Sequence, residues 1–80
     1  MDKIEAGTWR VSGSVWLQDF RREYPRLARA PGVDTIGGLV AMRMDEIPPV
    51  GSIVEFSGLR FTVEKADERR VKTVKIEMIP

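Results

Sequence analysis

Hydrophobic residues recur at two different spacings along the chain, and these spacings divide it into strands and helices. Residues 8–11 alternate between apolar and polar, with Trp9 and Val11 on one face, which is typical of a short strand. Residues 15–24 have helical spacing, Ser14 is the expected N-cap, and Pro25 is expected to end the helix. The apolar residues of this predicted helix are Trp16, Leu17, Phe20 and Tyr24.

A second predicted helix follows the loop at residues 25–33 and is capped by Asp34 or Thr35. Its apolar face fits a period of 3.6 residues. The residues of that face are Ile36, Leu39, Val40, Met44 and Ile47. Gly37 and Gly38 lie in the first turn of the helix, where glycine lowers helix stability. Two explanations stand: close packing of the helix backbone on the sheet, or approach of a phosphate to amide groups at the helix start. Gly37 and Gly38 are therefore the candidate cofactor-binding residues.

The last third of the chain predicts three strands joined by turns. Residues 47–51 combine two prolines and a glycine, which cannot continue a helix. Strands are predicted at residues 53–56 and 59–66, with a tight hairpin turn at Ser57 and Gly58. A final strand is predicted at residues 70–78. Val71 departs from its alternation, so we expect a bulge near Lys72 and Thr73.

The predicted order of elements is strand, helix, helix and then three strands. This order favours an α+β fold in which two helices cover one face of a small, mainly antiparallel sheet. Residues 1–7 are polar, and we expect them to be a linker or a frayed N-terminus. Residues 8–80 then form one domain, because 80 residues suffice for one thin core only.

Composition excludes several classes of function. The chain has no cysteine and no histidine, which removes the usual nucleophile and general base and most transition-metal ligands. We therefore expect no enzyme, no cofactor and no metal site. A net charge of +1 gives no global attraction for nucleic acid, and no apolar run is long enough to insert into a membrane.

Three groups of residues are candidate sites. Four arginines, Arg21, Arg22, Arg26 and Arg29, form a basic cluster, which is better explained as a solvated helix end and loop than as a nucleic-acid patch. Asp45 and Glu46, with Glu55 nearby, would suit a hard cation, but adjacent carboxylates at a helix end are usually just solvated. Trp9 and Trp16 are most simply core residues. Both are also interface candidates. Trp16 is expected to be half exposed, because it follows a turn closely.

Several of these motifs together resemble a known family. The chain is similar to the transporter-associated domain at the C-terminus of CorC/HlyC proteins, which comprise magnesium and cobalt efflux proteins and hemolysin-like proteins. The motifs that carry the resemblance are residues 7–14, 35–39, 47–51 and 58–63. In their order they cover residues 7–77. Residues 21–33 depart from the family, because they are rich in arginine where the family is more often acidic.

The resemblance implies a function and a setting. It implies a non-catalytic regulatory or interaction domain, the cytoplasmic soluble tail of an inner-membrane ion transporter with a membrane domain and a pair of CBS domains upstream. Apolar spans are then expected upstream in the source gene. The alternative is a domain that binds an adenine nucleotide or a flavin, since the family's fold is similar to part of the FAD-binding domains of vanillyl-alcohol oxidases. The family offers no catalytic residues to assign here.

We also expect a weak homodimer. The parent transporters are expected to be dimers by resemblance, and a lone small sheet leaves edge strands that must be paired, covered or charged. Arg69, Arg70, Lys72 and Lys75 partly protect the final strand by their charge. The interface is therefore expected at the region of Trp9 and Trp16 or at a sheet edge.

Overall fold

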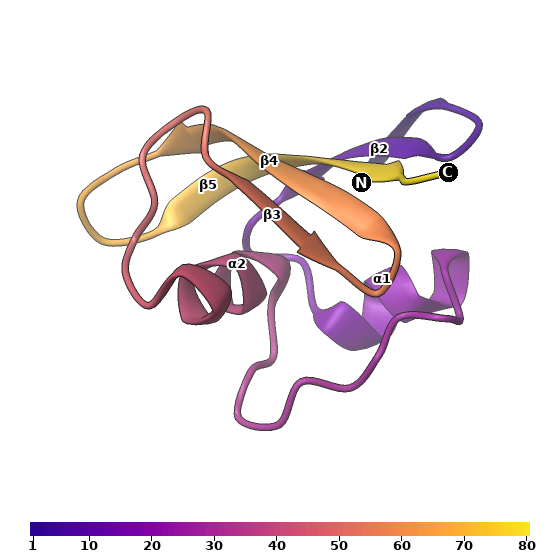
Figure 1. Ribbon diagram of the computed structural model, residues 1–80, viewed down its shortest axis with the longest axis horizontal. Coiled ribbons are helices and arrows are strands. Elements are labelled where there is room, and N and C mark those ends of the chain that lie inside the picture. Colours follow the sequence, from indigo (N-terminus) through magenta and orange to yellow (C-terminus); the bar gives the residue numbers. More distant parts are fainter.

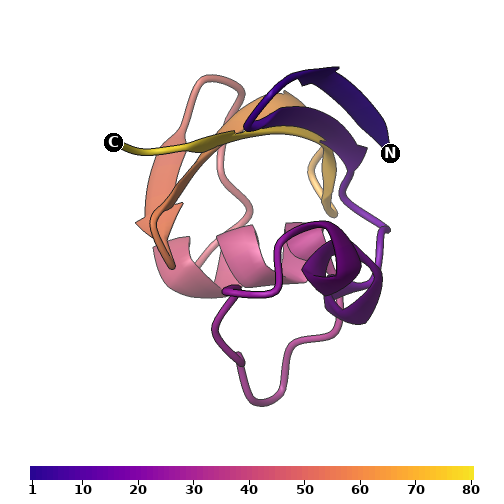
Figure 2. The ribbon, with the colours of Figure 1, turned by 90° about the vertical axis from the view of Figure 1, so that its right-hand side faces the viewer.

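Two helices pack against the concave face of a five-stranded antiparallel sheet (Figures 1 and 2). The computed structural model describes all residues, 1–80. The strands lie in the order β1-β2-β5-β4-β3, so the last strand of the chain occupies the centre of the sheet. In Figure 2 the sheet curves over α2 like an arch. The predicted α+β fold, with helices on one face of an antiparallel sheet, is confirmed.

The element boundaries follow the sequence pattern with a few corrections. The elements are β1 (Asp2–Glu5), β2 (Thr8–Ser12), α1 (Leu17–Glu23), α2 (Ile36–Met44), β3 (Ile53–Phe56), β4 (Leu59–Ala66) and β5 (Val71–Met78). The hairpin strands β3 and β4 have the predicted bounds. Neither helix is long enough to cross a bilayer, because they contain only seven and nine residues.

Strand β1 was not predicted. The N-terminal segment, expected to be a linker or frayed, pairs antiparallel with β2 and forms one edge of the sheet. All four of its residues are exposed, so it buries no apolar face that would reveal a strand by alternation. Backbone pairing holds it, as in Lys3 opposite Trp9. The observed order of elements is therefore two strands, two helices and three strands.

The two helices begin differently. The prediction that Ser14 caps the first helix was wrong: α1 starts later, Trp16 is its N-cap, and no side chain caps it. The Ser14 hydroxyl instead lies 2.9 Å from that of Ser12. For α2 the Thr35 cap is confirmed, because Thr35 Oγ1 accepts a hydrogen bond from the Gly38 amide at 3.0 Å.

The turn between β3 and β4 also holds the loop after α1. Ser57 and Gly58 both have left-handed backbone angles, φ 56° and 77°, as in a two-residue type I′ hairpin turn. The Tyr24 hydroxyl donates to the Ser57 carbonyl at 3.0 Å, and the Ala28 amide donates to Ser57 Oγ at 2.8 Å. This turn therefore ties the β3–β4 hairpin to the segment that follows α1.

The predicted irregularity in the last strand is confirmed. Lys65 lies opposite Thr73 and Ala66 lies opposite Val71, so Lys72 has no partner in β4. A second shift, between Val63 and Lys65, lies in β4 itself. Both shifts fall near the β4–β5 turn, where they bend that end of the sheet.

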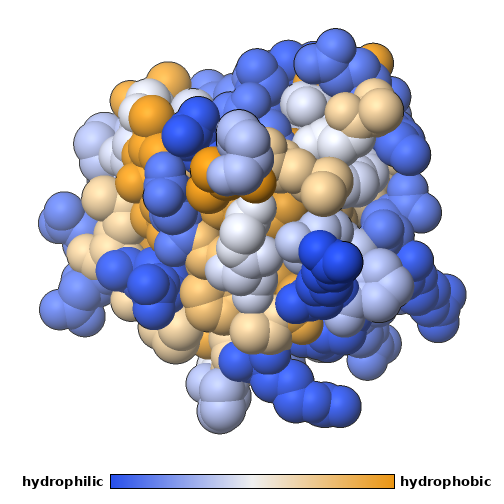
Figure 3. Space-filling model, turned by 45° about the vertical axis from the view of Figure 1, so that its right-hand side comes forward, coloured by the Kyte–Doolittle hydropathy of each residue, from blue (hydrophilic) through white to orange (hydrophobic).

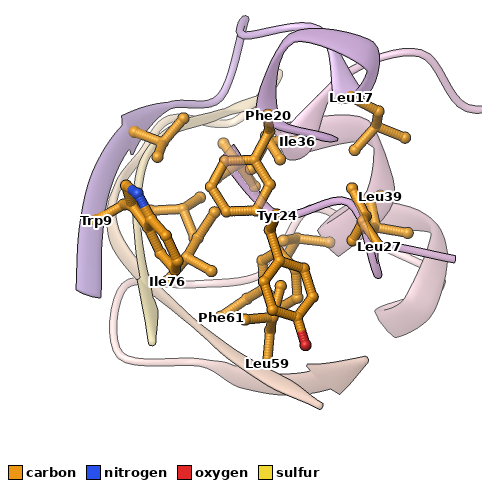
Figure 4. Packing of buried hydrophobic residues seen from close by; sticks show 14 of the residues in the cluster. Trp9, Leu17, Phe20, Tyr24, Leu27, Ile36, Leu39, Leu59, Phe61 and Ile76 are labelled. Carbon is orange, nitrogen blue, oxygen red and sulfur yellow. The ribbon is translucent and has the colours of Figure 1, made fainter. Parts of the chain in front are cut away.

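The core lies between the sheet and the helices. Trp9 of β2 is only 4% exposed and meets the ring of Phe20 edge-on, with centroids 5.2 Å apart (Figure 4). The Tyr24 ring lies 6.4 Å from Trp9, and its hydroxyl leaves the cluster towards the hairpin turn. In β4, the alternate residues Leu59, Phe61 and Val63 are all buried. Of the predicted apolar face of the second helix, Ile36, Leu39 and Val40 are buried and Met44 is partly buried. Ile47 lies beyond the end of α2 and is exposed.

Candidate functional site

Three segments distant in the sequence line a cavity on this chain. They are the turn at residues 12–14, the start of α2 and the β4–β5 turn with the residues that follow it. The cavity between them measures about 590 Å³. We call it the α2 pocket. Its lining residues are Ser12, Gly13, Ser14, Thr35, Gly37, Gly38, Ala41, Ile47, Arg69, Arg70, Val71 and Lys72.

Backbone hydrogen bonds fix the three segments relative to one another. The pairing of β2 with β5 continues past Ser12, where the Gly13 amide donates to the Lys72 carbonyl at 2.8 Å. The Gly37 amide in turn donates to the Gly13 carbonyl, also at 2.8 Å. The start of α2 is thus attached to the sheet through the residue-13 turn, and the pocket lies beside that junction.

Close backbone approach explains two of the glycines at this junction. A Cβ at Gly13 would lie 2.0 Å from the Val71 carbonyl oxygen, a distance that real structures do not allow. A Cβ at Gly37 would lie 3.0 Å from the Gly13 carbonyl oxygen and 3.1 Å from that of Val71. Gly37 therefore allows α2 to pack closely on the sheet, the first of the two explanations given for it.

The amides at the start of α2 already have partners inside the chain. Ile36 donates to the Val15 carbonyl at 2.9 Å, Gly37 donates to Gly13, and Gly38 donates to the Thr35 side chain. A ligand would meet the pocket's side chains before it met these amides. Both glycines nevertheless line the pocket, and their assignment as ligand-binding residues stays a prediction.

Hydroxyl groups line the pocket on the side of the residue-13 turn. Ser12 and Ser14 share one hydrogen bond between their hydroxyls, and Ser12 Oγ also accepts from the Ser14 amide at 3.2 Å. One of the two hydroxyl hydrogens therefore has no acceptor in the chain. Thr35 Oγ1 is an acceptor in its cap bond, so its hydrogen is also available.

Three basic residues also line the pocket. Arg69, Arg70 and Lys72 come from the β4–β5 turn and the start of β5, and no carboxylate lines the pocket. Asp67 holds this turn together, because its Oδ1 accepts from the amides of Arg69 at 2.8 Å and Arg70 at 2.9 Å. These two hydrogen bonds, with the nearby Lys72, hold the pKa of Asp67 below its ordinary value.

Sequence reasoning did not connect these basic residues with the two glycines. Arg69, Arg70 and Lys72 were assigned only to protection of the final strand as a sheet edge, and this was wrong, because β5 lies at the centre of the sheet. The signal that could have joined them to Ser12 and Gly37 is the pairing of β2 with β5, which is a contact between residues far apart in the chain. No local pattern carries that information.

The two tryptophans have different positions. Trp9 lies in the core, whereas the Trp16 side chain is 52% exposed. Of the two interface candidates, only Trp16 offers surface to a partner. It lines a second, smaller cavity of about 390 Å³ with Arg21, Arg29, Pro31 and Val33. On the face drawn in Figure 3, exposed apolar residues lie between hydrophilic ones.

Among the remaining candidates, Arg21 and Glu55 have structural contacts. Arg21 of the basic cluster donates from Nε to the Leu27 carbonyl at 3.1 Å and from a terminal nitrogen to that of Ala28 at 3.3 Å, which holds the loop after α1. No three carboxylates gather where they could hold a metal ion, so Asp45 and Glu46 have no third ligand in Glu55. Glu55 instead forms an ion pair with Arg60 at 3.4 Å.

One ion pair crosses the outer face of the sheet. Arg10 of β2 reaches across β5 to Glu64 of β4, with Nε 2.7 Å from Oε1. The guanidinium lowers the pKa of Glu64, and the carboxylate raises that of Arg10. Both side chains are partly exposed, so the pair orders this face more than it stabilises the fold.

Comparison with known proteins gives a consistent result along the whole chain. The family model CorC_HlyC, described as a transporter associated domain, matches residues 2–80. The magnesium and cobalt efflux protein CorC of Escherichia coli K12 is 32% identical over 76 residues, which are 95% of this chain and 26% of that protein. CorC of Vibrio cholerae is 32% identical over 74 residues. The chain thus spans about a quarter of the length of these relatives.

Solved structures agree with the sequence matches. The Mg2+ and Co2+ transporter (CorC) associated region from Neisseria meningitidis MC58 superimposes with a TM-score of 0.90 at 29% identity, covering 98% of this chain and 96% of that one. A hemolysin domain from Enterococcus faecalis V583 shares the fold with a TM-score of 0.86 at 17% identity, covering 99% and 96% of the two chains.

Proposed function

Because the chain belongs to the CorC_HlyC family of transporter associated domains, we propose that it is a regulatory and interaction domain of a magnesium and cobalt efflux protein. One observation carries the proposal: a match that covers 95% of this chain covers only 26% of the CorC relative. A domain that makes up a quarter of a transporter contributes to transport through the rest of that protein.

The proposal includes a setting for the domain. The chain is the cytoplasmic, soluble tail of an inner-membrane protein, and its partners are a membrane domain and a pair of CBS domains in the same polypeptide. It acts without catalysis, which agrees with a sequence that has no histidine and no cysteine. Its contribution to transport is then a change in the conformational equilibrium or assembly of the parent.

The test compares the parent transporter with and without this domain. Both forms are produced at equal levels in cells that lack their own efflux protein, and cobalt efflux and cobalt tolerance are measured over a range of external cobalt. We expect the deletion to leave the protein in the membrane but to change the rate of efflux or its dependence on cobalt. A matched control carries Arg22→Gln with Arg26→Gln, two exposed arginines outside the α2 pocket.

Two results contradict the proposal. One is a deletion form whose efflux equals that of the intact parent at every cobalt concentration. The other is a source gene that encodes no apolar spans upstream of this domain. Isolated domain added to membranes that contain the deletion form should restore the lost behaviour if the domain acts by contact.

The proposed assembly includes a weak homodimer of this domain. Its support is the exposed Trp16 on a chain whose other tryptophan is buried. Large aromatic side chains are enriched among the residues that dominate binding energy at interfaces.

A further inference from the structure

The α2 pocket combines a cavity, a local excess of positive charge and available hydroxyl donors. We infer that it binds a phosphate-bearing anion, held by Arg69, Arg70 and Lys72 and by the hydroxyls of the residue-13 turn. This inference does not depend on the proposed role in transport.

The charge of the pocket is a local property. The chain as a whole has 13 basic and 12 acidic residues, a net charge of +1. Among the twelve residues that line the pocket, three are basic and none is acidic. Clefts lined by one sign of charge concentrate ions of the opposite sign. The pocket therefore attracts anions although the molecule is nearly neutral.

The basic side chains of the pocket are available for a ligand. Arg10, Arg21 and Arg60 each donate to a carboxylate or a carbonyl of the chain. The guanidinium groups of Arg69 and Arg70 have no such bond, although Asp67 fixes the backbone amides of both residues. The turn thus fixes the backbone of both residues, whereas their side-chain donors remain unused. Arginine donors match the paired oxygens of a phosphate.

Lys72 has a partner that a ligand can share. Its Nζ lies 3.6 Å from Asp67 Oδ2, and both side chains are about half exposed. An exposed pair at that distance has a small interaction energy, so the ammonium group can turn towards an anion at little cost. Thr35 and one of the two serines, Ser12 or Ser14, supply free hydroxyl donors among the residues that line the pocket.

The size and the donors of the pocket indicate the class of ligand. A volume of about 590 Å³ lies within the range of small-molecule sites and exceeds what one phosphate fills. Three cations suit a diphosphate or a longer phosphate chain. The amides at the start of α2 are already bonded, so side chains would provide the binding, aided by the positive end of the helix dipole. Such a group could come from a soluble phosphate compound or from an anionic lipid headgroup.

The experiment measures binding of inorganic pyrophosphate to the isolated domain by calorimetry and by amide NMR shifts. We expect saturable binding that weakens as salt rises, with the largest shifts at Gly13, Gly37, Gly38 and the β4–β5 turn. The variant Arg69→Gln with Arg70→Gln should weaken binding at least tenfold. The control is Arg22→Gln with Arg26→Gln, which removes the same charge from exposed positions outside the pocket and should change binding less than twofold.

Further measurements distinguish a lipid headgroup from a soluble phosphate compound, and they test whether a variant that loses binding is still folded. Sedimentation with vesicles of phosphatidylglycerol tests the lipid, and vesicles of phosphatidylcholine are the neutral control. Binding to pyrophosphate, or to phosphatidylglycerol alone, supports the inference when only the pocket variant loses it. Absence of binding to both probes overturns it, as does an equal loss in the pocket and control variants. Circular dichroism and unfolding of each variant show that a loss of binding is not a loss of fold.

Discussion

At the scale of single residues, the junction between α2 and the sheet depends on the absence of a side chain at Gly13 and at Gly37. Gly13 and Gly37 approach the Val71 carbonyl so closely that no side chain fits between them. The backbone of α2 therefore meets the backbone of the sheet directly, and the position of the helix is set by hydrogen bonds as well as by apolar packing. A change at Gly13 would act on the whole junction.

Gly13→Ala should be among the most destabilising single substitutions in the chain. The new Cβ would lie 2.0 Å from the Val71 oxygen, so the turn or β5 must move. We expect a loss of about 3 kcal/mol in the free energy of unfolding, at the upper end for an overpacked site. Gly32→Ala is the control, because nothing lies within 4 Å of its Cβ and only its left-handed φ of 82° opposes alanine. It should cost about 1 kcal/mol. Equal urea midpoints for Gly13→Ala and Gly32→Ala would contradict the close approach of residue 13 to the Val71 carbonyl.

Asp67 should make the free energy of unfolding depend on pH in the acidic range. Its pKa is lowered in the folded state, so its contribution is fully present above the unfolded pKa of about 4 and is lost as the pH falls through the lower folded value. Asp67→Ala should therefore destabilise the domain at pH 7, and its difference from the wild type should shrink as the pH falls below about 4. Urea unfolding at several pH values measures this. Glu68→Ala is the control in the same turn. A difference that stays constant with pH would refute the assignment.

At the scale of elements, the parts predicted best are those whose signal is local. The β3–β4 hairpin was predicted with its observed bounds, because two segments rich in β-branched and aromatic residues flank a two-residue turn that ends in Gly58. Strand β1 was missed because backbone pairing at a sheet edge leaves no pattern in the side chains. The cap of α1 was misplaced because Ser12 and Ser14 bond to each other, a competition that the sequence alone does not resolve.

The hairpin turn offers a test with two matched variants. Ser57 has a left-handed φ of 56°, and its Oγ accepts from the Ala28 amide. Ser57→Ala loses this bond and keeps the backbone strain. Ser57→Gly loses the same bond but relieves the strain. We expect the alanine variant to be less stable than the glycine variant by about 1 kcal/mol. That difference corresponds to a gap in melting temperature of roughly 4–8 °C for a domain of this size. Calorimetry measures it, and a glycine variant that melts below the alanine variant would contradict the account.

At the scale of the whole molecule, the α2 pocket shows where prediction from sequence ends. Gly37 and Gly38 form a recognisable pair in the sequence. Nothing local relates this pair to the basic residues Arg69, Arg70 and Lys72. The central position of β5 in the sheet brings them together. A site made by strand order is visible only once the order is known. The exposure of the two tryptophans was also not predictable from the sequence. Both were interface candidates, but Trp9 is buried and Trp16 is exposed.

Exposure of Trp16 leads to the last prediction, which concerns self-association. Both edge strands are short, and the charges of Lys3 and Glu5 on β1 and Glu55 on β3 discourage pairing with another chain. A weak dimer would then use the surface around Trp16. Sedimentation equilibrium should show a dimer at high micromolar concentration, and Trp16→Ala should weaken it at least tenfold. Arg22→Gln is a control that should leave the dimer unchanged. Acrylamide quenching provides a second measurement: quenching of Trp16 should fall as the concentration rises, whereas the buried Trp9 is shielded throughout. A chain that stays monomeric at these concentrations, or a dimer indifferent to Trp16→Ala, would refute this interface.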